Sequence, residues 1–431
     1  MTDLKIPAED AQLLRAMVRR LIAASTVHPG QCTSSGVNTT GRTLLMPGTN
    51  EAGRSTYPAF WIRDPAWIAE TGLIPAQEVW GWLELMTSTM QGHESRYLSS
   101  GAIIPPYSIA DHINVDGSPV FYPGTYCSDG NQGPPYGVFP PHDNQYCVTL
   151  TAYAYAKLSD TPPMNVAVPT PMGDLPLSRV CELTHNAFPV DGSTQLCVAP
   201  INVDQHIVDW GYNDTITKTG KLLFPSLLRY ESALKLAHLF EAAELHDGAA
   251  TYQQQATRLQ RSIIETFYQE DDSHAGMLMS ATGIGYKPDV WGSAYAVYLN
   301  LLPDDLEQAT ARWLLRAYQR GDTTLLGQIR HLSISDGTWP LAKCAPGMYQ
   351  NGGYWGYATG WYVYALSRVD TFAAAQLFSE YLSYQRSIWD DSLRACSWEC
   401  INPAINHYQN PGYLATIALP YVALQHKKLI D

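Results

Sequence analysis

The sequence contains two carboxylates in settings that suit acid–base chemistry. Asp143 stands directly before a strongly apolar stretch, within the segment from His142 to Tyr146. Glu399 follows Trp398 and precedes an Asn-Pro turn, so it lies in an apolar loop where a solvated charge is a poor explanation. Glycosidic bonds are generally cleaved by two carboxyl groups, one acting as acid and the other as base or nucleophile. We therefore predict that Asp143 is a general acid and Glu399 a general base.

A second group of residues carries side chains that can hold a sugar. Carboxylates, amides and arginine can bind hydroxyl groups, tryptophan offers a face for stacking, and glycine lets the backbone approach a ligand closely. These residues occur in short segments that run into apolar stretches. The predicted substrate-binding residues are Trp61, Arg63, Asp64, Asp209, Trp210, Asp214, Trp291, Asn351, Gly352, Trp355 and Trp398.

Several of these residues also have a plain structural explanation. Asp143 has the residue type favoured at a helix N-cap. Arg63 and Asp64 could form an ion pair, and the segment that begins at Asn351 could be a helix entry turn. Asp209 and Asp214 are rival candidates for the acid, although hydroxyl binding suits them better.

Composition limits the classes of partner. The chain has 431 residues and a net charge of −13, which opposes binding to a nucleic-acid backbone. No uninterrupted apolar stretch approaches the roughly 20 residues of a membrane span, and no signal-peptide core is visible. The eight cysteines form no CxxC pair, and the twelve histidines are scattered. We therefore expect a soluble cytoplasmic protein with no metal or cofactor, no membrane or nucleic-acid partner and mostly buried, reduced cysteines; the oligomeric state is left open.

Apolar residues spaced three and four apart predict twelve helices in six pairs. Strand signals are few and short, and Val166 to Val168 is the best of them. Six loops bearing carboxylates, tryptophans or glycines run into helices, and a ring of such helices would gather these side chains in one acidic, aromatic cleft. The predicted helices cover residues 7–24 and 64–72, 76–91 and 144–158, 175–187 and 221–243, 247–268 and 290–301, 304–320 and 354–368, and 370–387 and 411–427.

Three long segments separate some of these helices. Residues 92–142 are rich in proline, glycine and tyrosine, and residues 25–60 and 188–219 are companion segments. Long loops inside a compact domain are commonly functional, so we predict that the three segments form lids. No glycine/serine-rich or charge-rich linker divides the chain, which predicts a single catalytic domain over residues 1–431.

The order of these motifs resembles that of the six-hairpin, or (α/α)6-barrel, glycosidases, over residues 57–415. This group includes neutral invertases, glycogen-debranching glucosidases and relatives of mannosylglycerate hydrolase. Arg63-Asp64 is similar to the pair that opens an inner helix and contacts substrate, and residues 142–146 to the segment that supplies the acid. Residues 210–214 are similar to the substrate loop, residues 351–355 to the Asn-Gly-Gly-x-Trp loop, and Trp398-Glu399 to the segment that carries the base.

The resemblance implies an all-α fold, a six-hairpin (α/α)6 barrel with long lid loops. It implies an inverting glycoside hydrolase, and a pocket closed by lids favours exo action on a small α-glucoside or disaccharide. Three alternatives stay open at this point. They are a sugar isomerase or epimerase that uses His142 and His407, a glycoside phosphorylase, and a carbohydrate-binding protein without catalysis.

Overall fold

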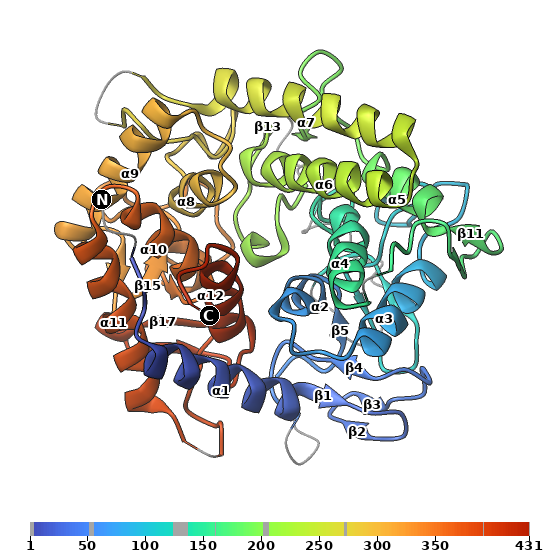
Figure 1. Cartoon of the computed structure of the whole chain (residues 1–431), viewed down its shortest axis with the longest axis horizontal. Coiled ribbons are helices and arrows are strands. Elements are labelled where there is room, and N and C mark those ends of the chain that lie inside the picture. Colours follow the sequence, from blue (N-terminus) through green and yellow to red (C-terminus); the bar gives the residue numbers. More distant parts are fainter. Residues whose placement is uncertain are drawn as a thin grey trace. The chain divides into compact units, whose positions relative to one another are not determined.

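The structure is a computed structural model that describes residues 4–50, 56–123, 137–159, 161–200, 207–270, 274–390 and 392–430. These ranges contain twelve α-helices, and each corresponds to one of the twelve predicted helices (Figure 1). None of the helices in the described ranges is long and apolar enough to cross a membrane. The helices are α1 Ala8–Ser25, α2 Arg63–Ile68, α3 Ala76–Ser88, α4 Asn144–Ser159, α5 Leu177–His185, α6 Leu223–Ala242, α7 His246–Phe267, α8 Val290–Tyr298, α9 Asp304–Gln319, α10 Thr359–Ser367, α11 Thr371–Ile388 and α12 Ala415–His426.

The helices are of two kinds, which follow from their apolar patterns. Helix α8 is buried along its whole length, and α10 and α12 are buried at nearly every position. Helix α9 buries one face. Glu307, Thr310, Ala311 and Leu314 on that face follow one another at steps of three, one and three residues. A helix that is apolar all round must lie inside a protein, whereas an amphipathic helix covers it. The alternation of the two kinds along the chain gives the predicted helix pairs.

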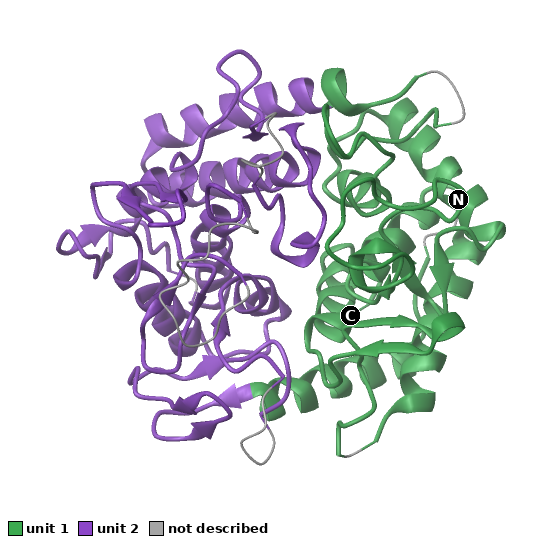
Figure 2. Cartoon of the chain, turned by 180° about the vertical axis from the view of Figure 1, so that it is seen from behind, with its two compact units in different colours: residues 1–25, 264–431 green, residues 26–263 purple. Residues whose placement is uncertain are grey.

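The chain divides into two compact units, which are coloured separately in Figure 2. Unit 2 comprises residues 26–263, and unit 1 comprises residues 1–25 and 264–431. This division does not test the single catalytic domain, which stays a prediction. Each unit is centred on one buried helix. Helix α4 packs against α2, α3, α5 and α6 in unit 2, and α10 packs against α8, α9, α11 and α12 in unit 1.

In unit 2, a three-stranded antiparallel sheet positions the start of α2. It consists of β5 (Phe60–Trp61), β8 (His112–Ile113) and β9 (Pro119–Val120), with β8 in the middle. Trp61 pairs with His112 in this sheet, and the Ile62 amide donates to the Asp111 carbonyl at 3.3 Å. The first residues of α2 therefore lie beside the segment that ends in β8.

In unit 1, a five-stranded antiparallel sheet joins loops that are far apart in sequence. Its order is β14 (Thr324–Leu325), β15 (Gln328–Arg330), β16 (Tyr354–Trp355), β17 (Cys400–Asn402) and β18 (His407–Gln409). Tyr354 pairs with Ile401, which brings the loop before α10 beside the loop that contains Glu399. The sequence did not predict this sheet, because strands of two or three residues show no period. Two helices begin later than predicted. Residues 354–355 form β16, so α10 begins at Thr359, and a turn at residues 411–412 precedes α12, which begins at Ala415.

The predicted lid segment 92–142 carries ordered structure in its described part. It contains β6 (Arg96–Tyr97), β7 (Ile103–Ile104), β8 and β9, and a small apolar cluster that includes Ile104 and Tyr122. Residues 124–136 lie outside the described residues. The remaining short strands are β1 Thr26–Val27, β2 Cys32–Thr33, β3 Gly36–Val37, β4 Leu44–Leu45, β10 Ala167–Val168, β11 Leu175–Pro176, β12 Val198–Ala199 and β13 Gly220–Lys221. The best predicted strand, residues 166–168, thus contains β10.

Seven cysteines fall within the described residues, and each is a free thiol; five of them are buried. Cys127 lies outside the described residues.

Candidate active site

Unit 2 contains a buried cluster of charges around Arg63. The guanidinium Nε donates to Asp143 Oδ2 at 2.9 Å, while Nη2 donates to Asp111 and, at 3.0 Å, to Asn144 Oδ1. The second oxygen of Asp111 contacts His112 Nδ1 at 2.8 Å. These side chains come from the start of α2, the segment before β8 and the start of α4. The side chains of Arg63, Asp111, Asp143 and His112 are at most 3% exposed.

Asp143 stands directly before α4 but does not cap that helix. Its Oδ2 accepts from Arg63, and its Oδ1 receives no hydrogen bond from the described residues. An N-cap aspartate would instead accept from the second or third amide of the helix. Asp289 does so before α8, where it accepts from the Gly292 amide at 2.7 Å. The N-cap explanation considered for Asp143 therefore does not apply, because its side chain binds Arg63 instead.

The two aspartates around Arg63 differ in proton affinity. Burial is the largest influence on Asp143 and raises the pKa of its carboxyl; Arg63 opposes the rise, and the neighbouring Asp111 adds to it. Burial also acts to raise the pKa of Asp111, but Arg63 and His112 outweigh it and hold the pKa of Asp111 below its usual value. The cluster thus contains one carboxyl that tends to keep its proton beside one that stays ionised.

The other predicted aspartates of unit 2 have separate partners. Asp209 is fully buried and accepts from Lys218 Nζ at 2.7 Å, from the Trp210 amide at 3.0 Å and from Asn213 Nδ2 at 3.1 Å. These three donors hold the Asp209 carboxylate in one orientation. Asp214 is partly exposed at the end of a short 3-10 helix, Gly211–Asn213.

The same loop packs directly on the Arg63 cluster. Tyr212 donates its hydroxyl to Asp64 Oδ1 at 2.8 Å, so the predicted Arg63–Asp64 ion pair is replaced by two sets of partners. A Cβ atom at Gly211 would lie 1.9 Å from Cζ of Arg63. Only glycine fits here, because any side chain would overlap the guanidinium.

Aromatic rings enclose this cluster. The Trp61 ring stacks on His112 with centroids 4.3 Å apart and lies 5.8 Å from the Arg63 guanidinium. The Trp210 ring stacks on Phe224 with centroids 3.8 Å apart, and it is only 1% exposed. Both predicted tryptophans are thus beside the cluster, where their faces are already covered by other rings.

Unit 1 contains a second buried carboxylate, Glu399. It is 2% exposed, and both of its oxygens accept hydrogen bonds from neutral donors. The Tyr349 hydroxyl donates to Oε1 at 2.9 Å, and Asn410 Nδ2 donates to Oε2. The Glu399 amide in turn donates to the carbonyl oxygens of Gln409 and Asn410, each at 3.0 Å. Side chain and backbone are therefore both fixed.

The residues that fix Glu399 have an unusual backbone. Tyr349, Ser397 and Asn410 have φ angles of 45°, 46° and 48°, in the left-handed region that non-glycine residues seldom adopt. Such a residue costs about 1–3 kcal/mol, and strained residues cluster at functional sites. Two of the three donate a hydrogen bond to Glu399, and the third lies two residues before it. The strained residues Tyr349 and Ser397 thus lie in two different loops, and both loops position Glu399.

The other predicted residues of unit 1 help to hold the segment that contains Tyr349. Trp355 is fully buried, and its Nε1 donates to the Tyr349 carbonyl at 3.3 Å. Asn351 uses its amide to accept from the Trp339 amide and to donate to the Cys344 carbonyl, both at 3.0 Å. Gly352 follows with a φ of 124°, which a side chain would disfavour. The structure gives these residues positions that hold the loop of Tyr349.

Trp291 and Trp398 have different surroundings. The Trp291 ring is buried and stacks on His331 with centroids 4.0 Å apart. Trp398 is partly exposed, and its ring lies 5.5 Å from the ring of Tyr408, which is 41% exposed. This pair is therefore the accessible aromatic surface next to Glu399.

Several residues of these clusters were not predicted from the sequence. Asp111 binds Arg63, which is 48 residues away in sequence, and Lys218 binds Asp209, which is 9 residues away. Tyr349 and Asn410 are 50 and 11 residues from Glu399 in sequence. Asp111 did carry a signal, since it interrupts the apolar run Ile-Ala-Asp-His-Ile. Tyr349 and Asn410 resemble ordinary loop residues in sequence.

No protein-family model matches the sequence, and no curated protein sequence matches it. Solved structures do match the fold. A rhamnosidase from Klebsiella oxytoca with rhamnose bound is similar with a TM-score of 0.56 at 12% identity, over 99% of this chain and 65% of the rhamnosidase chain. This chain thus spans slightly less than two thirds of that protein.

Two further structures match over almost their whole length. A glucoamylase from Saccharomycopsis fibuligera has a TM-score of 0.57 at 11% identity, over 99% of this chain and 98% of its own. A glycosidase variant has a TM-score of 0.53 at 13% identity, over 98% and 97%. The predicted fold is confirmed: the chain is mostly helical and has the (α/α)6, or six-hairpin, fold of these structures.

Proposed function

We propose that this chain is a glycoside hydrolase in which Glu399 is the general base. The observation that carries the proposal is the way this buried carboxylate is held by Asn410 and by Tyr349, which has a strained backbone. Hydrogen bonds from these two side chains fix the orientation of both carboxylate oxygens. A carboxylate so held can take a proton from a water molecule that attacks an anomeric carbon.

Asp143 is proposed as the general acid. Its pKa is raised chiefly by burial, while Arg63 opposes the rise. Asp111 and Asp209 suit this role less well, because each is bound by a cation. The acid would protonate the glycosidic oxygen as the bond to the leaving group breaks. Attack by water with this division of roles inverts the anomeric configuration.

The fold supports the reaction class. The three similar structures described above are a rhamnosidase, a glucoamylase and a glycosidase. Similarity of fold does not identify catalytic residues, so the roles of Asp143 and Glu399 are argued from the contacts within each unit. The proposed substrate is a small α-glucoside or disaccharide cleaved from its end. The Trp398–Tyr408 pair is the proposed stacking surface for one sugar ring, because an aromatic face beside the base remains accessible.

The contacts of His142 and His407 support the isomerase alternative less well than those of Asp143 and Glu399 support hydrolysis. His142 Nε2 bonds to the Val198 carbonyl at 2.9 Å, and His407 Nε2 accepts from the Tyr349 amide at 3.3 Å. Each ring therefore has a bond to the backbone, and His407 contributes to the support of Tyr349.

A proton NMR time course on α- and β-linked glucosides and disaccharides tests the proposal. We expect release of a sugar whose anomeric signal first appears with the configuration opposite to that of the substrate. The Glu399→Gln variant is the control for contaminating activity. Retained configuration would contradict the inverting mechanism, and a rate that requires phosphate would identify a phosphorylase. Sugar binding without turnover would favour a carbohydrate-binding protein.

A further inference from the structure

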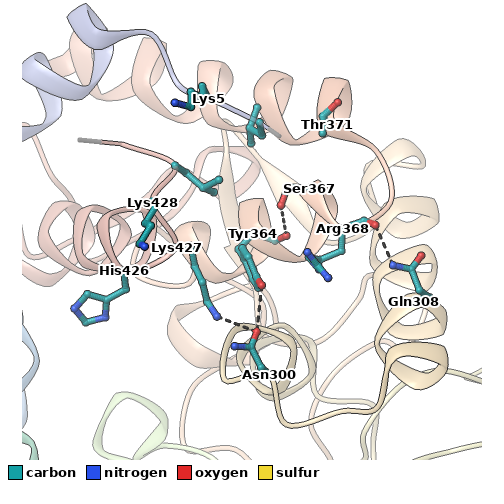
Figure 3. Close-up of a pocket in the computed structure, with 12 residues that line it drawn as sticks. Lys5, Asn300, Gln308, Tyr364, Ser367, Arg368, Thr371, His426, Lys427 and Lys428 are labelled. Atoms are coloured by element: carbon teal, nitrogen blue, oxygen red, sulfur yellow. Dashed lines mark hydrogen bonds between the residues drawn. The ribbon is translucent and has the colours of Figure 1, made fainter. Parts of the chain in front are cut away.

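A pocket distinct from both carboxylate clusters lies in unit 1 (Figure 3). It forms where α8, α10 and α12 end, and the residues just before α1 also line it. Its volume is about 640 Å³, which falls in the range of small-molecule sites. We call it the basic pocket, because Lys5, Arg368, Lys427 and Lys428 line it.

The charge of this pocket is opposite to that of the chain. Four cationic side chains line it and no aspartate or glutamate does, although the chain as a whole carries a net charge of −13. Arg368 Nε pairs with Glu307 at 2.6 Å. Within the described residues, Lys5, Lys427 and Lys428 form no ion pair. A concave surface of one sign concentrates its field and attracts counter-ions.

Lys427 is the most enclosed of these cations. Its Nζ donates to Asn300 Oδ1 at 3.0 Å, an oxygen that also accepts from the Tyr364 hydroxyl at 3.1 Å (Figure 3). The ammonium lies 4.3 Å from the centre of the Tyr364 ring. Burial lowers the pKa of Lys427 to about 8, with Arg368 adding to the fall and Glu307 opposing it. The protein therefore holds a partly desolvated cation near other cations, an arrangement that an anion would relieve.

The backbone gives an independent indication. Lys428, the first residue beyond the cap of α12, has a φ of 56°, and Asn300 has the same place after α8 with a φ of 52°. Glycine is the usual residue at such a position, since it adopts the left-handed conformation without strain. Asparagine tolerates that conformation, but lysine does not favour it. Lys428 thus places a long cationic side chain at the rim of the pocket, at a position that glycine would favour.

Helix capping explains only part of this arrangement. Cations near the C-terminal end of a helix complement its dipole, which accounts for Arg368 after α10 and Lys427 after α12. It accounts for Lys428 in the same way, but it does not account for Lys5, which precedes α1.

We propose that the basic pocket binds a phosphoryl group, either as free phosphate or as part of a phosphorylated sugar. Lysine and arginine together provide the donors that phosphate oxygens accept, and a dianion matches several cations better than a single carboxylate does. The amide of Gln308 and the hydroxyl of Thr371 line the same pocket and could meet sugar hydroxyls. This binding site is separate from the proposed hydrolytic function and is tested without measuring activity.

Isothermal titration calorimetry of the full chain with inorganic phosphate, glucose 6-phosphate and glucose tests the proposal. We expect both phosphate compounds to bind and glucose not to bind at this site. Loss of one charge-assisted hydrogen bond in Lys427→Gln should weaken the phosphate affinity by about tenfold. A stronger affinity for glucose 6-phosphate than for phosphate would identify a phosphorylated sugar as the ligand, and equal affinities would identify free phosphate.

Two further variants separate binding from folding. Lys428→Gly relieves the left-handed strain, so its melting temperature should equal or exceed that of the parent while its phosphate affinity falls. Lys157→Gln is the matched control, because Lys157 also lies in the last turn of a helix, with its ammonium 4.5 Å from a tyrosine ring. Absence of phosphate binding, equal binding of glucose, or the same loss in Lys157→Gln would overturn the proposal.

Discussion

The two carboxylate clusters of this protein are held by different kinds of partner. In unit 2, Arg63 binds Asp111 and Asp143, so charge is balanced by charge in a buried setting. In unit 1, Glu399 is held by the side chains of Tyr349 and Asn410, and both of these residues have left-handed backbone conformations. A buried ion pair makes stability depend on both partners. The orientation of Glu399 instead depends on hydrogen bonds from a hydroxyl and an amide.

The largest effect is expected from the loss of the proposed base. Glu399→Gln keeps the shape of the side chain but cannot accept a proton, so turnover should fall by about 10²–10⁴-fold. The measurement is kcat on whichever glycoside the NMR panel identifies. Glu380→Gln is a matched control, since Glu380 Oε1 also accepts from a tyrosine hydroxyl, that of Tyr318, at 2.9 Å. Equal rates for the parent and Glu399→Gln would remove Glu399 from its role.

A change at Arg63 should reduce stability strongly, in addition to any effect on Asp143. Arg63→Met leaves two buried carboxylates without their cation, and breaking a buried pair in this way costs about 3–5 kcal/mol. Chemical denaturation monitored by circular dichroism measures the free energy of unfolding. Arg42→Met, which breaks the exposed pair with Glu84, should cost at most about 1 kcal/mol. Similar losses in the two variants would contradict the distinction between the clusters.

Removal of one neutral donor should affect the rate more than the fold. Tyr349→Phe deletes the hydroxyl that holds Glu399 Oε1, and we expect about a tenfold lower kcat, equivalent to roughly 1.4 kcal/mol in the barrier. The stability cost of one hydrogen bond is about 1 kcal/mol. Tyr318→Phe removes the corresponding hydroxyl from Glu380 and should leave kcat unchanged. A Tyr349→Phe enzyme with full kcat would show that this bond serves only the fold.

The smallest expected effect is a shift in pH dependence. Activity requires protonated Asp143, so the rate should fall as pH rises through the pKa of Asp143, which burial raises. The charge of Asp111 also raises that pKa, so Asp111→Asn should move the alkaline limb of kcat/KM to lower pH. A limb that stays in place, or moves to higher pH, would exclude Asp143 as the group responsible.

The helical framework could be predicted from the sequence, because it depends on local pattern. Each predicted helix has a counterpart, and the largest deviations occur where a short strand or turn takes the first residues, as at Tyr354 and Trp355 in β16. The two proposed catalytic carboxylates were also predicted, since a charge in an apolar, tryptophan-flanked segment is visible without a structure. The partners of these carboxylates were not visible.

Asn351 shows why a predicted residue can change its role. Its sequence neighbours, two glycines and two aromatic residues, suit a sugar-binding loop. In the structure, both ends of its amide bond to the backbone. A polar side chain finds its partner only when the chain around it has folded, and backbone groups compete with any ligand for it.

The sequence by itself determined the helices and the presence of two carboxylates in apolar surroundings. These features are properties of residues close together in the chain, where spacing and side-chain type act directly. Only the tertiary structure decided that Asp111 shares Arg63 with Asp143 and that Tyr349 and Asn410 hold Glu399. Those contacts depend on strands of two or three residues that pair across long loops, and so short a strand is stable only where the rest of the fold brings its partner to it.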